Sequence, residues 1–533
     1  MSDRAPAAVP PAGGPKARVY YPLALAFFPT LSLAAGNRGE NIRLGDLVFP
    51  LLICFWTALT AWAVARALTR DRDRRALITV ALVAWFLGYG VIATAMLELP
   101  PGFPLGREEF LLPLSLLLLL LTCWLIFKWK GDLGGVSRFL NRVTLLLFLF
   151  LPARYLGASR APSITWKPTI PSTDVHSAEP DSLPDIYYVV LDAYTGSKSL
   201  LTNYGFDNSS FESWLRSRGF YVPRESRSNY ASTFLALAAA LNWQYLDWIP
   251  NTLGKSSRDR TLPYRMIEDS RTVRLLKTLG YRIVFFPTAY GATSRIMYAD
   301  ELIPSGARGQ PKVHSEFLAV WIRLTILPSL VDVGCRISKC NLDAMPFQPE
   351  SPNLILWKFT RLGEVATSRR GPKFVFAHLL VPHEPYVFEA NCAPKPIHWS
   401  ARVDPAGDPD MHRAYVEQVR CVNLQLETFI RHVLEKSPRP PIIILQADHG
   451  NGRFPFGRPP DLGDISLDQL TERTDIFAAY YLPGAHVVLY DSITPINVLP
   501  IILRTYFGAA IPPLEDHTYY SSWGQPYRFT QIR

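Results

Sequence analysis

Five acidic or imidazole side chains stand at or near the ends of apolar runs in this sequence. They are Asp192, His378, His383, Asp448 and His449. A single acid after a strand is usually a turn or helix-cap residue, and a single histidine is usually a satisfied core or surface group. Five of them in similar positions instead predict a metal site. Carboxylate oxygen with imidazole nitrogen suits zinc or manganese better than magnesium or calcium.

A hydroxyl group that such a metal could activate stands in SRSNYASTFLALAAALN, residues 226–242. Either Ser232 or Thr233 directly precedes a run rich in alanine and leucine, which predicts a helix. Capping that helix is the ordinary role of a hydroxyl in this position. The two roles are compatible, because backbone N–H groups at a helix N-terminus also stabilise the negative charge of a phosphoryl group.

The elements that must position these residues are short apolar strands alternating with amphipathic helices, from Asp185 onwards. We expect strands at 186–191, 281–286, 373–380, 441–445 and 476–482, and helices from about Asn208, at 411–434 and at 493–506. This alternation predicts an α/β domain over residues 185–533, with a mostly parallel sheet between helices. Ligands of such sheets bind beyond the carboxyl ends of the strands.

Residues 1–156 contain long apolar blocks instead, and we expect them to form a membrane anchor of about five transmembrane helices. The blocks are 20–35, 47–65, 77–97, 110–127 and 143–155. The middle three approach the roughly 20 residues that a helix needs to cross a bilayer. The first contains two prolines, and the last is short enough to be a buried core helix. Residues 157–184, rich in proline, serine and threonine, are expected to be a linker.

The loops between the blocks predict how the anchor is oriented. The loop at 66–75 and the segment from Lys128 to Arg142 are basic, whereas glutamates outnumber Arg107 in the loop between them. Basic loops stay in the cytoplasm. Five spans then place everything after residue 157 on the far side of the membrane, an outcome that depends on the last block being a span.

The formal net charge of +10 is not a nucleic-acid signature, because +6 of it falls on the first 150 residues. In the exported part, no run of lysine and arginine is interleaved with aromatic residues. We therefore expect no nucleic-acid partner.

Four of the six cysteines fall in the exported part, where disulfides persist. We expect Cys335 to pair with Cys340 and Cys392 with Cys421. Zinc binding by the segment CRISKC, residues 335–340, is the alternative.

The segment EFLAVWIRLTILPSLVDV, residues 316–333, is unusually apolar for the exported part. An arginine and a proline interrupt it, which argues against a membrane span. Leu318, Ile322 and Ile326 fall on one stripe, so we expect a helix packed on the sheet. The alternative is a helix at the membrane surface whose outer face, including Trp321, touches lipid.

Four segments taken together resemble the alkaline phosphatase superfamily, in particular its sulfatase-like branch. They are PDIYYVVLDAY, SNYASTFLALAAALN, FVFAHLLVPHEPYVF and ILQADHGNG, in that order. The resemblance covers about residues 185–520. A five-span anchor with an exported C-terminal domain resembles lipoteichoic acid synthases and lipid A phosphoethanolamine transferases.

The resemblance implies a set of metal ligands, which are Asp192, Thr233, Asp448 and His449. It also implies that Thr233 is the nucleophile and that His383, in PHEPY, lies near the substrate phosphate or the leaving group. We expect His383, helped by His378, to protonate the departing alkoxide and later to deprotonate the acceptor.

Three positions depart from the family pattern. The nucleophile segment lacks the cysteine that sulfatases convert to formylglycine, which disfavours sulfate-ester hydrolysis. Asp192 stands where the transferases carry glutamate, so the charge is kept and the reach is shorter. Ala236 stands where serine is usual, three positions after Thr233.

The expected function is therefore that of a metal-dependent, membrane-embedded phosphotransferase. It would move phosphoethanolamine or phosphoglycerol from a phospholipid donor to an envelope glycolipid or glycan through a phosphothreonine-type intermediate. One alternative is a sulfatase-like hydrolase of phosphodiesters or sulfate esters, because site access, not the nucleophile, chooses between acceptor and water. The other is a non-catalytic envelope binding protein, which is disfavoured because all four expected ligand positions are filled.

Overall fold

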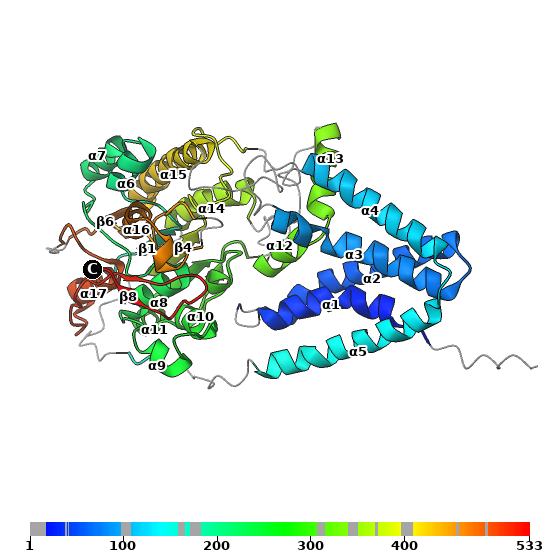
Figure 1. Ribbon diagram of the computed structural model, residues 1–533. Coiled ribbons are helices and arrows are strands. Elements are labelled where there is room, and N and C mark those ends of the chain that lie inside the picture. The colour runs from blue at the N-terminus through cyan, green and yellow to red at the C-terminus, as the bar shows by residue number, and fades with distance from the viewer. Residues whose placement is uncertain are drawn as a thin grey trace, which may run out of the picture. The chain divides into compact units, whose positions relative to one another are not determined.

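The computed structural model describes residues 18–37, 40, 42–96, 108–157, 166–170, 183–305, 315–338, 350–367, 371–395, 409–454, 458–484 and 489–533. The chain divides into two compact units (Figure 1). The membrane unit comprises Met1–Gly36, Leu44–Ala158 and Trp321–Leu330. The catalytic unit comprises Asn37–Arg43, Ser159–Val320 and Val331–Arg533. Most of the expected linker, 157–184, lies outside the described residues.

Five helices form the N-terminal part of the membrane unit. They are α1 (Tyr21–Gly36), α2 (Leu44–Leu68), α3 (Arg72–Met96), α4 (Glu108–Lys128) and α5 (Leu133–Gly157). Among the described residues, four helices, α2 to α5, are long and apolar enough to cross a membrane. Helix α1 has 16 residues, or about 24 Å at 1.5 Å per residue, against roughly 30 Å of hydrocarbon. The weakest span is therefore the first block and not the last.

The apolar segment 316–333 does not pack on the sheet, so that expectation was wrong. It forms two helices, α12 (Glu316–Arg323) and α13 (Leu327–Ser338). Its central residues belong to the membrane unit, where Trp321 donates from Nε1 to Thr30 Oγ1 at 2.7 Å. Trp321 is 2% exposed, so it does not offer an outer face to lipid either.

The backbone between α12 and α13 lies directly on helix α3. Gly90 donates its N–H to the carbonyl of Leu324 at 3.0 Å, and Ile326 donates to the carbonyl of Phe86 at 2.9 Å. In a regular helix, the Gly90 N–H would donate to the Phe86 carbonyl. Here both groups bond to the segment between α12 and α13. A Cβ on Gly90 would lie 2.0 Å from the Arg323 carbonyl oxygen, so this close approach requires glycine.

The catalytic unit is built on a six-stranded sheet of order β3-β2-β4-β1-β5-β6. The strands are β1 (Ile186–Leu191), β2 (Arg282–Phe286), β3 (Glu301–Leu302), β4 (Lys373–Leu379), β5 (Ile442–Ala447) and β6 (Ala478–Tyr481). The first five are parallel, and β6 pairs antiparallel with β5. A separate two-stranded ribbon joins β7 (Tyr519–Tyr520) to β8 (Thr530–Gln531). The predicted α/β class with a mostly parallel sheet is confirmed.

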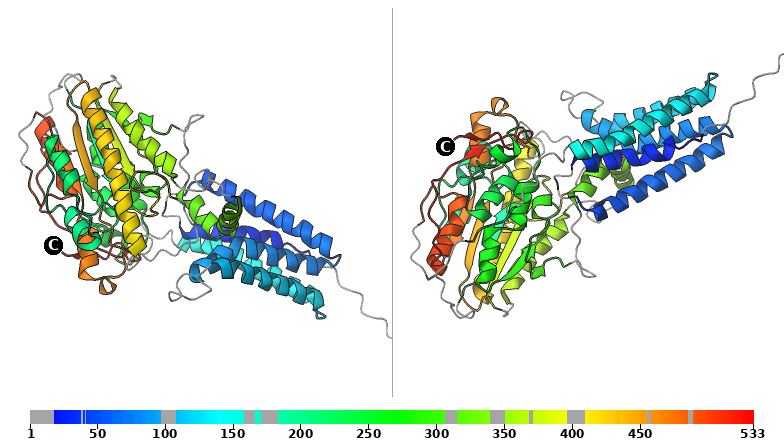
Figure 2. Two further views of the ribbon diagram at one scale, coloured as in Figure 1. Left: turned by 90° about the horizontal axis from the view of Figure 1, so that it is seen from above. Right: turned by 90° about the horizontal axis from the view of Figure 1, so that it is seen from below.

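Helices cover both faces of this sheet (Figure 2). Alternate residues of a strand point to opposite faces, and in β1 Tyr188 and Val190 join one core cluster while Tyr187 and Val189 join the other. The first face is covered by α8 (Thr233–Asn242), α10 (Thr261–Glu268), α11 (Arg271–Thr278) and α17 (Pro495–Phe507). The second is covered by α6 (Ser197–Tyr204), α7 (Ser209–Ser217), α14 (Pro352–Glu364) and α15 (Pro409–Lys436). Two more helices, α9 (Ile249–Leu253) and α16 (Leu467–Thr474), complete the unit.

One of the two expected disulfides is present. Cys392 and Cys421 are bonded at an S–S distance of 2.08 Å, which confirms that pairing and attaches the segment after β4 to α15. The side chains of Cys335 and Cys340 lie outside the described residues.

Candidate active site

The strand register brings the two aspartates to one level of the sheet. Leu191, the last residue of β1, pairs with Leu379 on one side and with Ala447 on the other. Asp192 and Asp448 follow Leu191 and Ala447 directly, so both carboxylates leave the sheet at the carboxyl ends of adjacent strands. Neighbouring strands lie about 4.8 Å apart, which places the two charges close together.

Three buried side-chain atoms at this edge lie at ion-pair distances from neighbouring groups but form no hydrogen bond in the described part of the chain. They are Asp192 Oδ1, His378 Nε2 and Asp448 Oδ2. The three residues can each offer one ligand atom within 4.8 Å of the others. Burying carboxylate oxygens without a hydrogen bond is costly. This donor set of two carboxylates and one imidazole fits a divalent cation such as zinc or manganese.

His449 has its ring nitrogens in defined roles. Its Nδ1 donates to the carbonyl of Gly450 at 3.0 Å, so Nε2 carries the lone pair. That Nε2 lies 3.3 Å from Asp448 Oδ2 and 3.8 Å from Asp192 Oδ1. A cation would stabilise lone pairs of nitrogen and oxygen that face each other in this way. His449 therefore fits as a fourth metal ligand beside Asp192, His378 and Asp448.

The candidate nucleophile reaches the same point from the other side. Ser232 is the N-cap of α8 and makes no side-chain cap bond to the described part of the chain, and Thr233 is the first residue of the helix. Thr233 Oγ1 lies 3.0 Å from His449 Nε2. The structure thus brings the Thr233 hydroxyl to the cluster.

The two other histidines are held in different ways. His378 lies inside β4, opposite Val190, with Nδ1 at 2.9 Å from Thr293 Oγ1 and Nε2 at 3.4 Å from Asp192 Oδ2. This buried position among ligand atoms suits metal binding better than the proton-transfer role we expected from the sequence. His383 lies in the loop after β4 and donates from Nδ1 to the carbonyl of Glu384 at 2.7 Å, which leaves its Nε2 for a substrate.

Sequence reasoning missed Arg473, the last but one residue of α16. It is buried, and its Nε donates to the carbonyl of Ala231 at 2.7 Å while its Nη1 donates to the carbonyls of Gly450 at 3.2 Å and Asn451 at 3.0 Å. Its Nη2 lies 3.2 Å from His449 Nε2. One guanidinium therefore ties the nucleophile segment to the loop that carries Asp448 and His449.

Steric contact explains why glycine, Gly450, follows His449. A Cβ on Gly450 would lie 1.9 Å from the carbonyl oxygen of Glu472, so only glycine lets this loop pass beside α16. Two residues later, Gly452 has φ of +76°, a left-handed conformation that side chains disfavour. The loop DHGNG is thus shaped by contact with α16.

The charges of the site act on one another. Burial opposes ionisation of Asp192, but His383 and His378 hold its pKa below the usual range. Burial, together with the charge of Asp192, raises the pKa of Asp448. Burial and the charge of Arg473 lower the pKa of His449 well below its usual value, which keeps the imidazole neutral. Burial also lowers the pKa of Arg473 to about 10.

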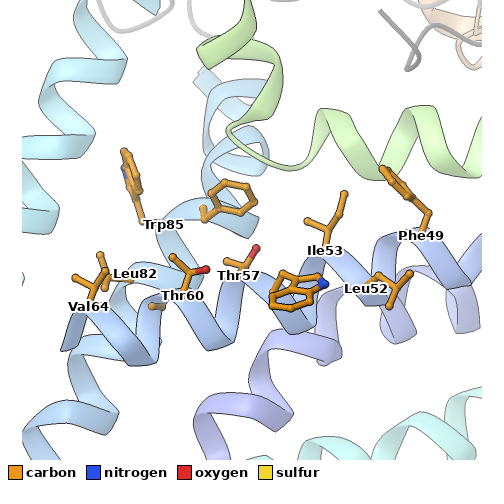
Figure 3. A pocket seen from close by; sticks show the side chains of 11 residues that line it. Phe49, Leu52, Ile53, Thr57, Thr60, Val64, Leu82 and Trp85 are labelled. Atoms are coloured by element: carbon orange, nitrogen blue, oxygen red, sulfur yellow. The ribbon is translucent and has the colours of Figure 1, made fainter. Parts of the chain in front are cut away.

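A separate pocket of ≈ 590 Å³ lies on the membrane unit (Figure 3). Residues of α2 and α3 line it, among them Leu52, Trp56 and Trp85, and its polar groups include the threonine hydroxyls of Thr57 and Thr60. None of its lining residues has a titratable side chain.

No family model matches this chain, and no curated protein matches it. Solved structures do. The C-terminal periplasmic domain of EcEptC from Escherichia coli, in complex with Zn, is 11% identical with a TM-score of 0.40, covering 69% of this chain and 96% of that one. Phosphonate monoester hydrolase of Agrobacterium radiobacter is 11% identical with a TM-score of 0.40, covering 63% of this chain and 80% of that one.

A third similar structure includes a membrane part. It is the integral membrane protein lipooligosaccharide phosphoethanolamine transferase A (EptA) from Neisseria meningitidis, which is 14% identical with a TM-score of 0.39, covering 88% of this chain and 89% of that one. Since all three TM-scores are below 0.5, the function of this chain has to be inferred from the residues of its own site.

Proposed function

We propose that this protein is a metal-dependent enzyme that transfers a phosphoryl-containing headgroup from a membrane phospholipid through Thr233. The observation that carries the proposal is the convergence of three buried atoms without a hydrogen bond in the described part of the chain, on Asp192, His378 and Asp448, beside the Thr233 hydroxyl, whose Oγ1 lies 3.0 Å from His449 Nε2. A nucleophilic hydroxyl next to a cation site is the arrangement that metal-assisted phosphoryl transfer requires.

The metal would be held by Asp192, His378, Asp448 and His449. When bound, it would lower the pKa of the Thr233 hydroxyl and neutralise charge on the phosphate. The Thr233 hydroxyl then gives up its proton to solvent as its Oγ1 attacks phosphorus, and the bond from phosphorus to the diacylglycerol oxygen breaks. Thr233 is the first residue of α8, so the positive end of the helix dipole would stabilise the charge of a phosphoryl group on its oxygen.

His383 would handle the proton of this step. Its Nδ1–H is occupied by the Glu384 carbonyl, so Nε2 is the atom that gives a proton to the departing oxygen and later takes one from the acceptor hydroxyl. Gln418 of α15 holds the loop in place by donating to the carbonyls of Pro382 at 3.1 Å and His383 at 2.9 Å. A glycolipid or glycan hydroxyl then attacks phosphorus and releases Thr233.

A phospholipid donor is the natural substrate because four helices of the same chain can cross a membrane. Phosphoethanolamine and phosphoglycerol are the headgroups we propose. Attack by water in place of the acceptor would make the same site a phosphodiester hydrolase. A sulfatase remains disfavoured, because the nucleophile segment lacks the cysteine that sulfatases convert to formylglycine.

The test uses purified full-length protein and a phosphatidylethanolamine with a fluorescent acyl chain, with release of diacylglycerol as the readout. Thr233→Ala should lower the rate at least about 100-fold, because the attacking oxygen is removed. Ser232→Ala is the matched control, one residue away, and should stay within about threefold of the wild-type rate. Full turnover by Thr233→Ala would refute the proposed mechanism.

A further inference from the structure

A groove of ≈ 730 Å³ lies in the catalytic unit, and its lining includes none of the candidate metal ligands. One wall comes from the segment that contains α9, and the other comes from the C-terminal ribbon of β7 and β8. Its lining combines aromatic rings with amide, carboxylate and basic side chains. A volume between about 300 and 1,000 Å³ is typical of sites that bind small molecules.

Two aromatic rings of this groove are less exposed than three of its polar side chains. Tyr519 and Phe529 are half-buried, whereas Asp247, Asn251 and Lys255 are exposed. In the described part of the chain, these three exposed side chains form no ion pair and no side-chain hydrogen bond. Their donors and acceptors are therefore available to a ligand.

The groove is connected to the nucleophile segment by direct contacts. Tyr519 donates its N–H to the carbonyl of Asn229 at 2.9 Å. The Tyr230 ring lies 5.6 Å from the Tyr519 ring and 5.3 Å from the Phe529 ring. Tyr230 stands three residues before Thr233, so their Cα atoms are at most about 11 Å apart. Tyr230 itself is buried, so these contacts join the groove to the nucleophile segment through the core of the unit.

We propose that this groove binds a saccharide chain carrying an acidic group, as the acceptor of the transfer. Sugar rings present apolar C–H faces, which pack on aromatic rings, and hydroxyl edges, which hydrogen-bond to side chains such as Asp247 and Asn251. Two cations, Lys255 and Arg528, outnumber the single carboxylate of the lining, which favours a negatively charged saccharide. This inference rests on the proposed function and names the acceptor class for it.

The experiment measures binding by titration calorimetry, with the full-length protein in detergent and a hyaluronan tetrasaccharide as the acidic probe. We expect saturable binding to the wild-type protein, and binding of neutral maltotetraose at least about tenfold weaker. The double variant Asn251→Ala/Lys255→Glu should weaken binding of the acidic probe at least tenfold. Both side chains are exposed, so its melting temperature should stay close to that of the wild type. The matched control is Lys436→Glu, an equal charge change on an exposed residue of α15, which should bind like the wild type.

Absence of binding by the wild-type protein, or equal binding by the double variant, would overturn the inference. Equal affinity for maltotetraose would overturn the assignment of an acidic saccharide. Release of diacylglycerol by the wild-type protein, measured without saccharide, tests the proposed function separately. Normal release with no saccharide binding would refute this inference alone. Saccharide binding without release would refute the proposed function, and with it the acceptor role of the groove, but would leave the groove a saccharide site.

Discussion

At the scale of single residues, the structure gives different positions to two histidines that look alike in the sequence. His378 Nε2 is buried among ligand atoms, whereas His383 lies in a loop with Nε2 left for a substrate. We predict that His378→Ala lowers metal affinity at least about tenfold, because a ligand is lost. His383→Ala should keep the metal and lose turnover. Elemental analysis of both purified variants, beside a rate measurement, checks this; metal lost equally from both would mean that His383 is a ligand too.

Arg473 supports the second prediction at this scale. Its planar fork binds three backbone carbonyls in two loops, an arrangement that a lysine cannot reproduce. Arg473→Lys should lower both the melting temperature and the rate of diacylglycerol release, the latter at least about tenfold. Arg458→Lys, at an exposed position, is the control and should change neither. A wild-type rate in Arg473→Lys would show that the two loops hold their positions without the guanidinium.

At the scale of elements, helix α3 has two glycines with different surroundings. A Cβ on Gly90 would collide with the backbone at Arg323 and Leu324, whereas nothing lies within 4 Å of a Cβ on Gly88. We predict that Gly90→Ala displaces the segment Trp321–Leu330 and destabilises the protein by about 1–3 kcal/mol. Gly88→Ala should be neutral or slightly stabilising, because alanine favours the helix.

Limited proteolysis of the full-length protein in detergent checks the glycine pair. Faster cleavage within 321–330 is expected for Gly90→Ala and not for Gly88→Ala. If the two variants were cleaved at the same rate, the close contact of this segment with α3 would not hold in solution.

At the scale of the whole molecule, the open question is which side of the membrane the catalytic unit occupies. The Cys392–Cys421 disulfide favours an oxidising compartment, and the basic loop at 66–75 favours the cytoplasm for its own end of α2 and α3. We predict that a membrane-impermeant maleimide labels Lys436→Cys in intact cells from which the outer membrane barrier has been removed. Arg70→Cys should become labelled only after the cells are lysed. Labelling of Arg70→Cys before lysis would contradict the predicted topology.

Local sequence determined much of this protein. Runs of apolar residues at 186–191, 373–380 and 441–445 could be read as strands because buried parallel strands are apolar on both faces. Since all such strands end at one edge of a sheet, Asp192 and Asp448 could be placed together from order alone. Long apolar blocks likewise predicted the membrane helices, because lipid leaves no other way to satisfy the backbone.

Only the tertiary structure decided the remaining features, and each depends on a contact between distant parts of the chain. Arg473 was missed because β6 runs antiparallel, so the residues before this strand, and not those after it, lie at the site edge. The segment 321–330 was wrongly expected on the sheet because an apolar stripe does not specify which apolar surface it will cover. The segment packs on α3 because Gly90 lets the two backbones approach and form hydrogen bonds. The local sequence of the segment does not contain this information.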